Sequence, residues 1–127
     1  MEPVTLVDAE NVRRSEWPNI GRDELAPLVR VWADAVGARV VLVFDGPAPE
    51  AQDGKRFRVV GTEGESADDW IARAAERLAR EERPYRLVTS DRGLRARAGG
   101  HADDVVGGGT FAQILRAVPT GAARRHA

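Results

Sequence analysis

The sequence predicts an α/β fold with three layers, in which helices cover both faces of a mainly parallel sheet of about five strands. Short apolar segments rich in β-branched residues alternate with amphipathic segments, as in parallel βαβ units. The 127 residues contain no internal repeat or linker, and 43% of them are hydrophobic, which suffices for one continuous core. We therefore expect a single domain over residues 1–118 and a flexible tail over residues 119–127.

The first half of the chain contains three predicted strands and one predicted helix. Residues 4–7 form a short apolar strand that runs into Asp8 and a polar loop. Residues 23–37 place their apolar side chains on one helical stripe that ends in a glycine. Residues 39–44 (RVVLVF) are typical of a strand buried on both faces, and residues 55–60 alternate as a third strand.

The second half of the chain continues the same alternation. Residues 63–79 begin with acidic side chains and continue as an apolar helical stripe, and a serine followed three positions later by an aspartate resembles a capping box. Residues 85–91 and 102–109 are the fourth and fifth predicted strands. Residues 110–118 predict a last helix capped by Thr110.

Composition narrows the classes of function. With 19 basic and 20 acidic side chains the net charge is -1, so no global positive field indicates nucleic acid, although a local basic surface is compatible with this balance. The absence of cysteine excludes disulfides, thiol nucleophiles and cysteine zinc sites. We find no signal peptide or membrane-spanning run, and we expect a cytoplasmic protein without a membrane partner.

Aspartates follow the predicted strands at the points where those strands end. Asp8, Asp45 and Asp91 follow the first, second and fourth strands, while Asp68 and Asp69 precede a helix. In a parallel sheet these positions lie at one edge, where ligands bind. Because crowded carboxylates repel one another, we expect a divalent cation such as Mg²⁺ or Mn²⁺ among them. The pattern indicates metal-dependent hydrolysis.

Four motifs in this order carry a family resemblance. They are VDAEN, FDG, GESADDWI and VTSDRGL. Together they resemble the NYN branch of the PIN-like nucleases, particularly the YacP-like ribonucleases, over about residues 4–115. The resemblance implies strand order 3-2-1-4-5, dependence on Mg²⁺ or Mn²⁺, and endonucleolytic cleavage of RNA.

The resemblance also implies roles for individual residues. Asp8, Asp68 and Asp91 correspond to the catalytic acids that hold the metal, and Asn11 corresponds to the adjacent asparagine. Asp69 stands where the family often has a glutamate. The chain departs from the family pattern at the two residues after Asp8, where many relatives have glycine and an aromatic residue; this departure concerns substrate recognition more than catalysis.

Several of these residues also have a purely structural interpretation. Asp91 is compatible with a helix cap, and Asp45 with a local turn or a second metal site. A charged group directly after a buried central strand is costly, which favours a functional role for Asp8. We expect four residues to support the site: Asn11, Asp45, Asp69 and Ser90.

RNA contacts are expected from basic and aromatic side chains near the same edge. Arginines position RNA through its phosphates, and an exposed tryptophan stacks on a base. The alternative for each is an ordinary solvated side chain. Five residues are candidates for RNA contact: Arg13, Arg14, Arg56, Arg92 and Trp17. The other two tryptophans, Trp32 and Trp70, fit helical core stripes.

Three functions remain open, of which a metal-dependent endoribonuclease ranks first. The second is a non-catalytic RNA-binding or ribosome-associated module with the same fold, which the loss of a catalytic acid would favour; none is missing. The third is a phosphatase with Asp8 as nucleophile. It ranks last because the sequence has DAENV instead of an Asp-x-Asp-x-Thr motif and contains Lys55 as its single lysine.

Overall fold

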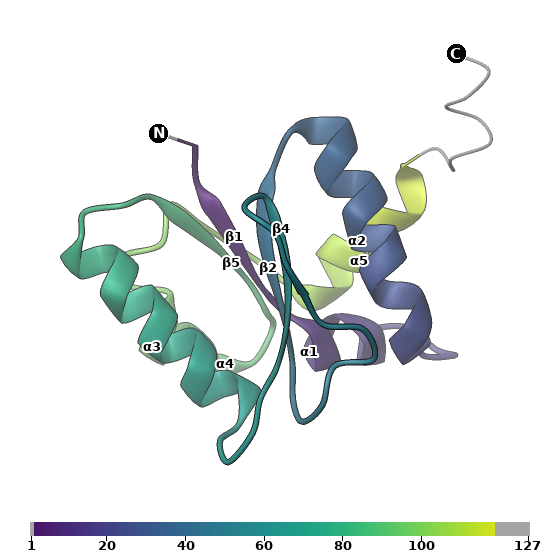
Figure 1. The fold of residues 1–127 in the computed structure, drawn as a ribbon, viewed down its shortest axis with the longest axis horizontal. Coiled ribbons are helices and arrows are strands. Elements are labelled where there is room, and N and C mark those ends of the chain that lie inside the picture. Colours follow the sequence, from purple (N-terminus) through teal and green to yellow (C-terminus); the bar gives the residue numbers. More distant parts are fainter. Residues whose placement is uncertain (1, 119–127) are drawn as a thin grey trace.

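A computed structural model describes residues 2–118 of the chain, and the predicted tail over residues 119–127 lies outside the described part. Figure 1 shows helices packed on both sides of a twisted sheet. The elements in chain order are β1 (Val4–Asp8), α1 (Ala9–Arg14), α2 (Arg22–Val36), β2 (Arg39–Phe44), β3 (Gln52–Asp53), β4 (Phe57–Gly61), α3 (Ala67–Arg80), β5 (Tyr85–Val88), α4 (Arg92–Ala98), β6 (Asp104–Val106) and α5 (Gly108–Ala117).

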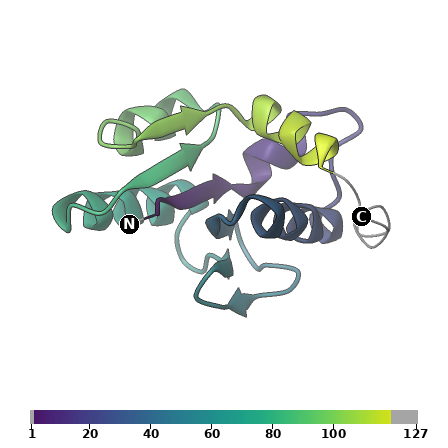
Figure 2. The same cartoon turned by 90° about the horizontal axis from the view of Figure 1, so that it is seen from above.

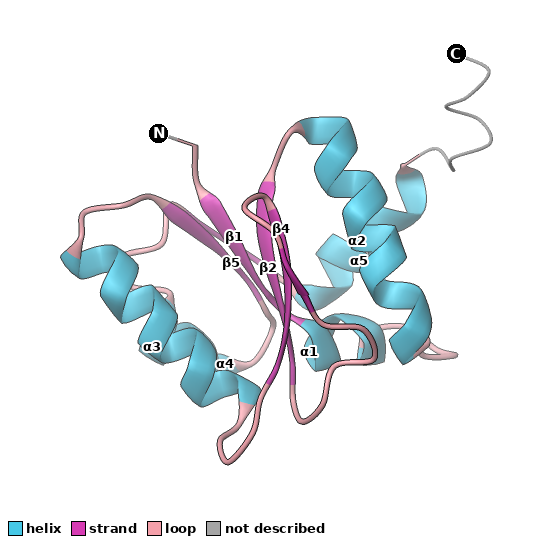
Figure 3. Ribbon diagram, in the orientation of Figure 1, coloured by secondary structure: helices cyan, strands magenta, loops and turns pink. Residues whose placement is uncertain are grey.

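The sheet has the order β3-β4-β2-β1-β5-β6, with every neighbouring pair parallel except β3 and β4 (Figure 3). The five predicted strands therefore lie in the predicted order 3-2-1-4-5, and the three-layer α/β/α fold is confirmed. The strands expected over residues 85–91 and 102–109 are shorter, as β5 and β6. Strand β1 lies between β2 and β5, so Asp8 ends a central strand opposite Val43.

Two apolar cores lie on the two faces of the sheet. Helices α3 and α4 cover one face, while α1, α2 and α5 cover the other (Figures 1 and 2). Along β1, Leu6 packs on the α3 side and Val7 on the α2 side, as the alternation of side chains in a strand requires. Trp32 is buried as predicted, edge-on to Phe111 with ring centroids 4.9 Å apart, whereas Trp70 is only partly buried.

Helix α1 and strand β3 were not expected from the sequence, and a short helix after Asp91 was considered only in the interpretation of Asp91 as a helix cap. Helix α1 replaces the first part of the polar loop predicted after β1, and α4 follows Asp91 directly. Both helices begin at an aspartate, since Asp8 and Asp91 are their N-caps. Strand β3 has two residues and pairs antiparallel with β4, so the two strands form a hairpin at the edge of the sheet. Helices of six and seven residues are too short to show an apolar stripe, so they left no periodic signal.

Helix ends follow local backbone chemistry. Gly37 ends α2 with φ 71°, which confirms the predicted stop. Helix α5 begins two residues earlier than expected, because the amide of Phe111 donates to the carbonyl of Gly107 and closes the first turn there. Thr110 therefore lies inside the helix, and the prediction that it caps α5 is wrong. No helix between residues 2 and 118 is both long and apolar enough to span a bilayer.

Gly61, at the end of β4, allows a close backbone approach. A Cβ atom there would overlap the backbone nitrogen of Ala48 and the carbonyl oxygen of Gly46. We expect Gly61→Ala to lower the free energy of unfolding by about 1–3 kcal/mol, because backbone must shift to admit the methyl group. Urea denaturation measures this change. Gly100→Ala is the control, since nothing lies within 4 Å of its added Cβ; equal stabilities of the two variants would contradict the prediction.

Candidate active site

A depression of about 290 Å³ opens at the edge of the sheet where the parallel strands end. Its lining comes from the ends of β1 and β2, the residues after β5, and the starts of α1 and α3. Four aspartates face it: Asp8, Asp45, Asp68 and Asp91. The parallel topology therefore gathers acidic side chains that are up to 83 positions apart in the sequence.

Asp8 is the most buried of these carboxylates, with 5% of its surface exposed. The hydroxyl of Thr89 donates to its Oδ2 at 2.9 Å, and the backbone amide of Asn11 approaches its Oδ1 at 3.4 Å. Burial, with a smaller contribution from the charges of Asp68 and Asp91, raises the pKa of Asp8 from 3.8 to about 6, although the two hydrogen bonds lower it. Desolvation and the neighbouring negative charges therefore both disfavour the ionised form of Asp8.

Thr89 joins two of the aspartates and was not among the residues selected from the sequence. Its hydroxyl donates to Asp8 and accepts a hydrogen bond from the backbone amide of Asp91 at 3.1 Å. The side chain is completely buried. Its position directly after a buried strand and two residues before Asp91 was the available signal, because a polar group there needs a hydrogen-bond partner.

Asp68 lies in the first turn of α3. Burial raises its pKa, followed by the charges of Asp91, Asp45 and Asp69, while Arg97 lowers it. Asp68 and Asp8 are thus each perturbed by the same neighbour, Asp91. The charge of Asp91 therefore acts on both carboxylates across the depression.

The start of α3 is fixed by two side-chain acceptors. Asp45 Oδ1 accepts from the backbone amide of Ala67 at 3.0 Å, and Ser66 Oγ accepts from the amide of Asp69 at 3.1 Å. The predicted serine cap is confirmed. Asp45 has a structural role as well, since it ties the end of β2 to the first turn that carries Asp68.

Three helices begin around the depression. Asp8 caps α1, Asp91 Oδ1 accepts from the amide of Leu94 at 2.8 Å to cap α4, and Asp45 contacts the start of α3. Helix N-termini carry partial positive charge and stabilise nearby carboxylates. The capping and the site interpretations are therefore compatible, because Asp91 Oδ2 has no hydrogen bond to any residue in the described range.

Asn11 and Ser90 hold the surrounding loops together. Asn11 Oδ1 accepts from the backbone amide of Ser90 at 2.8 Å, and Ser90 Oγ accepts from the amide of Gly108 at the same distance. A Cβ atom on Gly108 would overlap the side chain of Asn11. These contacts tie α1 and α5 to the segment that carries Asp91.

The chain matches a known protein family over most of its length. The sequence model of the YacP-like NYN domain matches residues 6–123. This chain belongs to the YacP-like NYN domain family. No curated protein matches it in sequence.

Two solved structures share the fold of this YacP-like NYN domain. The crystal structure of Rae1 (YacP) from Bacillus subtilis is 21% identical, with a TM-score of 0.74 over 99% of this chain and 80% of that chain. A single-residue mutant of the same Bacillus subtilis protein is 23% identical, with a TM-score of 0.71 over 97% of this chain and 78% of that one. At this identity the likeness concerns the fold.

The remaining predicted residues lie in different places. Asp69 does not line the depression, because its carboxylate pairs with Arg97 at 2.9 Å. Arg14 lines it, and Arg92 is exposed at the start of α4. Arg13 is largely buried and pairs with Glu10 at 2.7 Å, so its guanidinium makes an ion pair within the protein instead of facing a ligand.

Two candidate RNA contacts do not line the depression. Arg56 precedes β4 and donates to the carbonyl of Gly37, at the opposite edge of the sheet, so the expectation that it borders the aspartates is wrong. Its position follows from the parallel direction of β4. Trp17 lies in the loop between α1 and α2 with 90% of its surface exposed.

The donor set fits a hard divalent cation. All four aspartates offer carboxylate oxygen. Burial and then repulsion raise the pKa of Asp8 and of Asp68, and a cation relieves the repulsion. Across residues 2–118, no three His, Cys, Asp or Glu side chains stand together with the spacing of a metal cluster. Mg²⁺ commonly uses one or two protein carboxylates and several waters, so it does not require such a cluster.

The raised pKa of Asp8 predicts a pH-dependent stability. Because the folded chain binds this proton more tightly than the unfolded chain, Asp8 makes stability fall as pH rises from about 4 to about 6. In EDTA at neutral pH, the free energy of unfolding of the Asp8→Asn variant should therefore be about 1–3 kcal/mol higher than that of the wild type. The difference should vanish below about pH 4, where the carboxyl is protonated in both states.

Urea denaturation of both proteins across this pH range measures the effect. Asp34→Asn is the control, since Asp34 is an exposed side chain of α2. A stability difference between Asp8→Asn and the wild type that did not change with pH would contradict the prediction.

Proposed function

We propose that this YacP-like NYN domain is a metal-dependent endoribonuclease that hydrolyses RNA phosphodiester bonds. NYN domains are generally nucleases, and family membership supports this class of activity. The observation that carries the proposal is the meeting of Asp8, Asp68 and Asp91, from three separate segments, around one depression. The raised pKa values of Asp8 and Asp68 add support, because perturbed carboxylates in a concavity are typical of catalytic sites.

In this proposal Asp8, Asp68 and Asp91 together hold the cation, one or two of them directly and the others through its bound waters. A bound Mg²⁺ or Mn²⁺ ion would supply Lewis-acid stabilisation of the phosphodiester and lower the pKa of water. Thr89 orients Asp8 through the 2.9 Å hydrogen bond, and Asp45 holds the first turn of α3. These contacts fix the carboxylates before substrate arrives, which lowers the cost of ordering them.

RNA is the proposed substrate, and side chains at the rim are proposed to hold it. Arg14 lines the depression and Arg92 is exposed directly after Asp91, so both are placed to bind phosphate. Trp17 offers an exposed ring for base stacking on the loop after α1. We also propose a cytoplasmic location, which the lack of cysteine supports.

The first test is cleavage of labelled single-stranded and structured RNA with Mn²⁺, Mg²⁺ or EDTA. We expect wild-type cleavage with either metal and none in EDTA. Asp8→Asn, Asp68→Asn and Asp91→Asn should each reduce the rate by at least about 100-fold, because each removes a negative ligand. Gel analysis of the RNA fragments measures the rates.

Asp69→Asn is the matched control, because it changes the neighbouring carboxylate on the same helix turn and Asp69 pairs with Arg97 outside the depression. Its rate should remain within a few-fold of the wild type. Cleavage that persists in EDTA or in all three aspartate variants would refute the mechanism. RNA binding without cleavage of free or ribosome-bound RNA would favour the non-catalytic module.

The second test is metal binding, which is independent of any substrate. Mn²⁺ at about 100 times its Kd should stabilise the wild type by about 2.7 kcal/mol, because the ion binds only the folded chain. Asp91→Asn should lose most of this increment, while Asp69→Asn should keep it. Thermal denaturation with and without Mn²⁺ measures the increment. Equal increments in the two variants would show that the ion binds elsewhere.

A further inference from the structure

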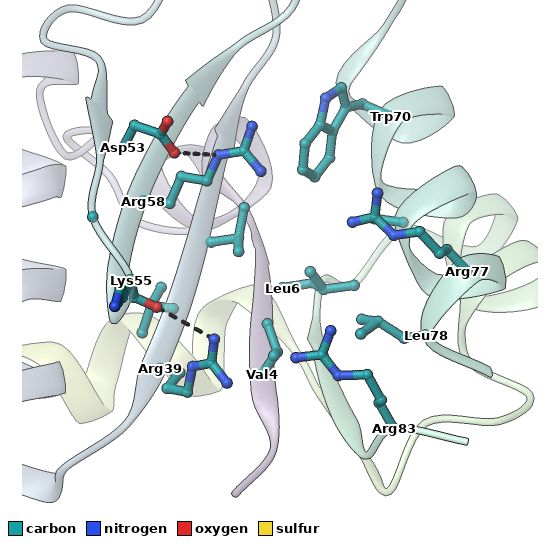
Figure 4. A pocket seen from close by; sticks show the side chains of 14 residues that line it. Val4, Leu6, Arg39, Asp53, Lys55, Arg58, Trp70, Arg77, Leu78 and Arg83 are labelled. Carbon is teal, nitrogen blue, oxygen red and sulfur yellow. Dashed lines mark hydrogen bonds and ion pairs between the residues drawn. The ribbon is translucent and has the colours of Figure 1, made fainter. Parts of the chain in front are cut away.

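A second concavity, of about 330 Å³, lies on the α3 face of the sheet (Figure 4). We call it the α3 groove. It is bounded by α3 on one side and by β2, β4 and the β3–β4 hairpin on the other. Apolar side chains such as Leu6 and Leu78 line its base. Five cationic residues line it: Arg39, Lys55, Arg58, Arg77 and Arg83.

The positive charge of the α3 groove is only partly neutralised. Asp53 is the single acid in its lining, and it pairs with Arg58 at 3.3 Å. Arg83 pairs with Glu81 at 3.6 Å, whereas Arg77 and Lys55 form no ion pair with any residue in the described range. In Figure 4 the guanidinium groups of the sheet and of α3 point into the groove from opposite sides. A chain with net charge -1 thus concentrates cations in this groove.

An aromatic ring lies in the same groove. Trp70 is partly buried, and the guanidinium of Arg58 lies 5.6 Å from its ring centre. A neighbouring concavity on α3 shares three residues with the α3 groove, namely Arg58, Trp70 and Arg77. It is also lined by Arg73 and Arg80. Arg73 pairs with Glu65 and Arg80 with Glu76, so Arg58 and Arg77 supply most of the positive charge beside the indole ring.

The α3 groove begins close to the aspartates. Asp68 lines the depression at the start of α3, and Trp70 lines the groove two residues later. From Asp68 to Arg77 the helix rises by about 14 Å, a span of a few nucleotides. An extended chain bound at the aspartates can therefore continue along this groove.

We propose that the α3 groove binds single-stranded RNA on one side of the bond that is cut at the aspartates. The inference rests on the proposed function and specifies its substrate as a strand that extends beyond the cleavage site. Arginines on both sides contact successive phosphates, and Trp70 with the apolar base receives unstacked bases. An acidic peptide would use the cations but has no base to stack on the aromatic ring, so RNA fits the groove better.

Fluorescence anisotropy of the full chain in EDTA tests this proposal, because binding is then read without metal-dependent cleavage. The probe is a fluorescein-labelled oligouridylate of about 12 nucleotides. Arg77→Ala should weaken binding about tenfold, and Arg58→Ala/Arg77→Ala should weaken it further. The slope of log K against log salt should become shallower by about 0.7 for each arginine that loses a phosphate contact.

Arg116→Ala is the matched control, because it removes one half-exposed arginine from α5, on the other face of the sheet. Its affinity and salt slope should equal those of the wild type. Trp70→Leu should weaken binding several-fold with an unchanged salt slope, since stacking involves no phosphate. Urea denaturation checks that each variant is folded.

Three results would overturn the proposal. They are equal RNA affinities for Arg77→Ala and Arg116→Ala, equal competition by polyglutamate, and equal competition by duplex RNA. The outcome is separate from that of the nuclease test. A wild type that cuts RNA while Arg77→Ala binds normally refutes only the groove. A wild type that cuts no RNA while Arg77→Ala loses affinity refutes only the nuclease and retains the groove as an RNA-binding site.

Discussion

Electrostatic repulsion among four aspartates is the constraint on which the rest of this structure depends. The parallel sheet places the ends of its strands at one edge, and Asp8, Asp45 and Asp91 each accept a hydrogen bond from the start of a helix there. The helix N-termini offset part of the repulsion, so the fold tolerates a concentration of charge that remains unfavourable. Burial raises the pKa of Asp8 most, and the charges of Asp68 and Asp91 add to it, so this pKa reflects both the desolvation and the repulsion that the fold accepts at this site.

Hydrogen bonds between segments that are distant in the sequence hold the residues of the site in their relative positions. Thr89 connects β1 to the loop after β5, and Asn11 and Ser90 connect that loop to α1 and α5. Most of these contacts involve a backbone amide, which side-chain substitution elsewhere does not remove. The aspartates are therefore positioned by the path of the chain as much as by their own rotamers, as a preorganised site requires.

The gathering of Asp8, Asp68 and Asp91 was predictable from the apolar strand segments and the direction of parallel strands, whereas the sheet order was predictable only from the family resemblance. Thr89 and the pairing of Asp69 with Arg97 depend on contacts between remote segments, which no local pattern records. Short helices such as α1 lack periodicity. The α3 groove was also not predicted, because its cations come from strands, a hairpin and a helix that are remote in the sequence.

Helix α3 contributes to the depression, to the α3 groove and to the apolar core. Its N-terminus presents Asp68 to the depression, one side presents Trp70 and Arg77 to the groove, and its buried side packs Ile71 and Leu78 on the sheet. A helix is stiff over this length, so a tilt that improves one contact displaces the others. Among homologous chains, substitutions along α3 should consequently be accepted in compensating groups, while α2 is free to change residue by residue on its solvent side.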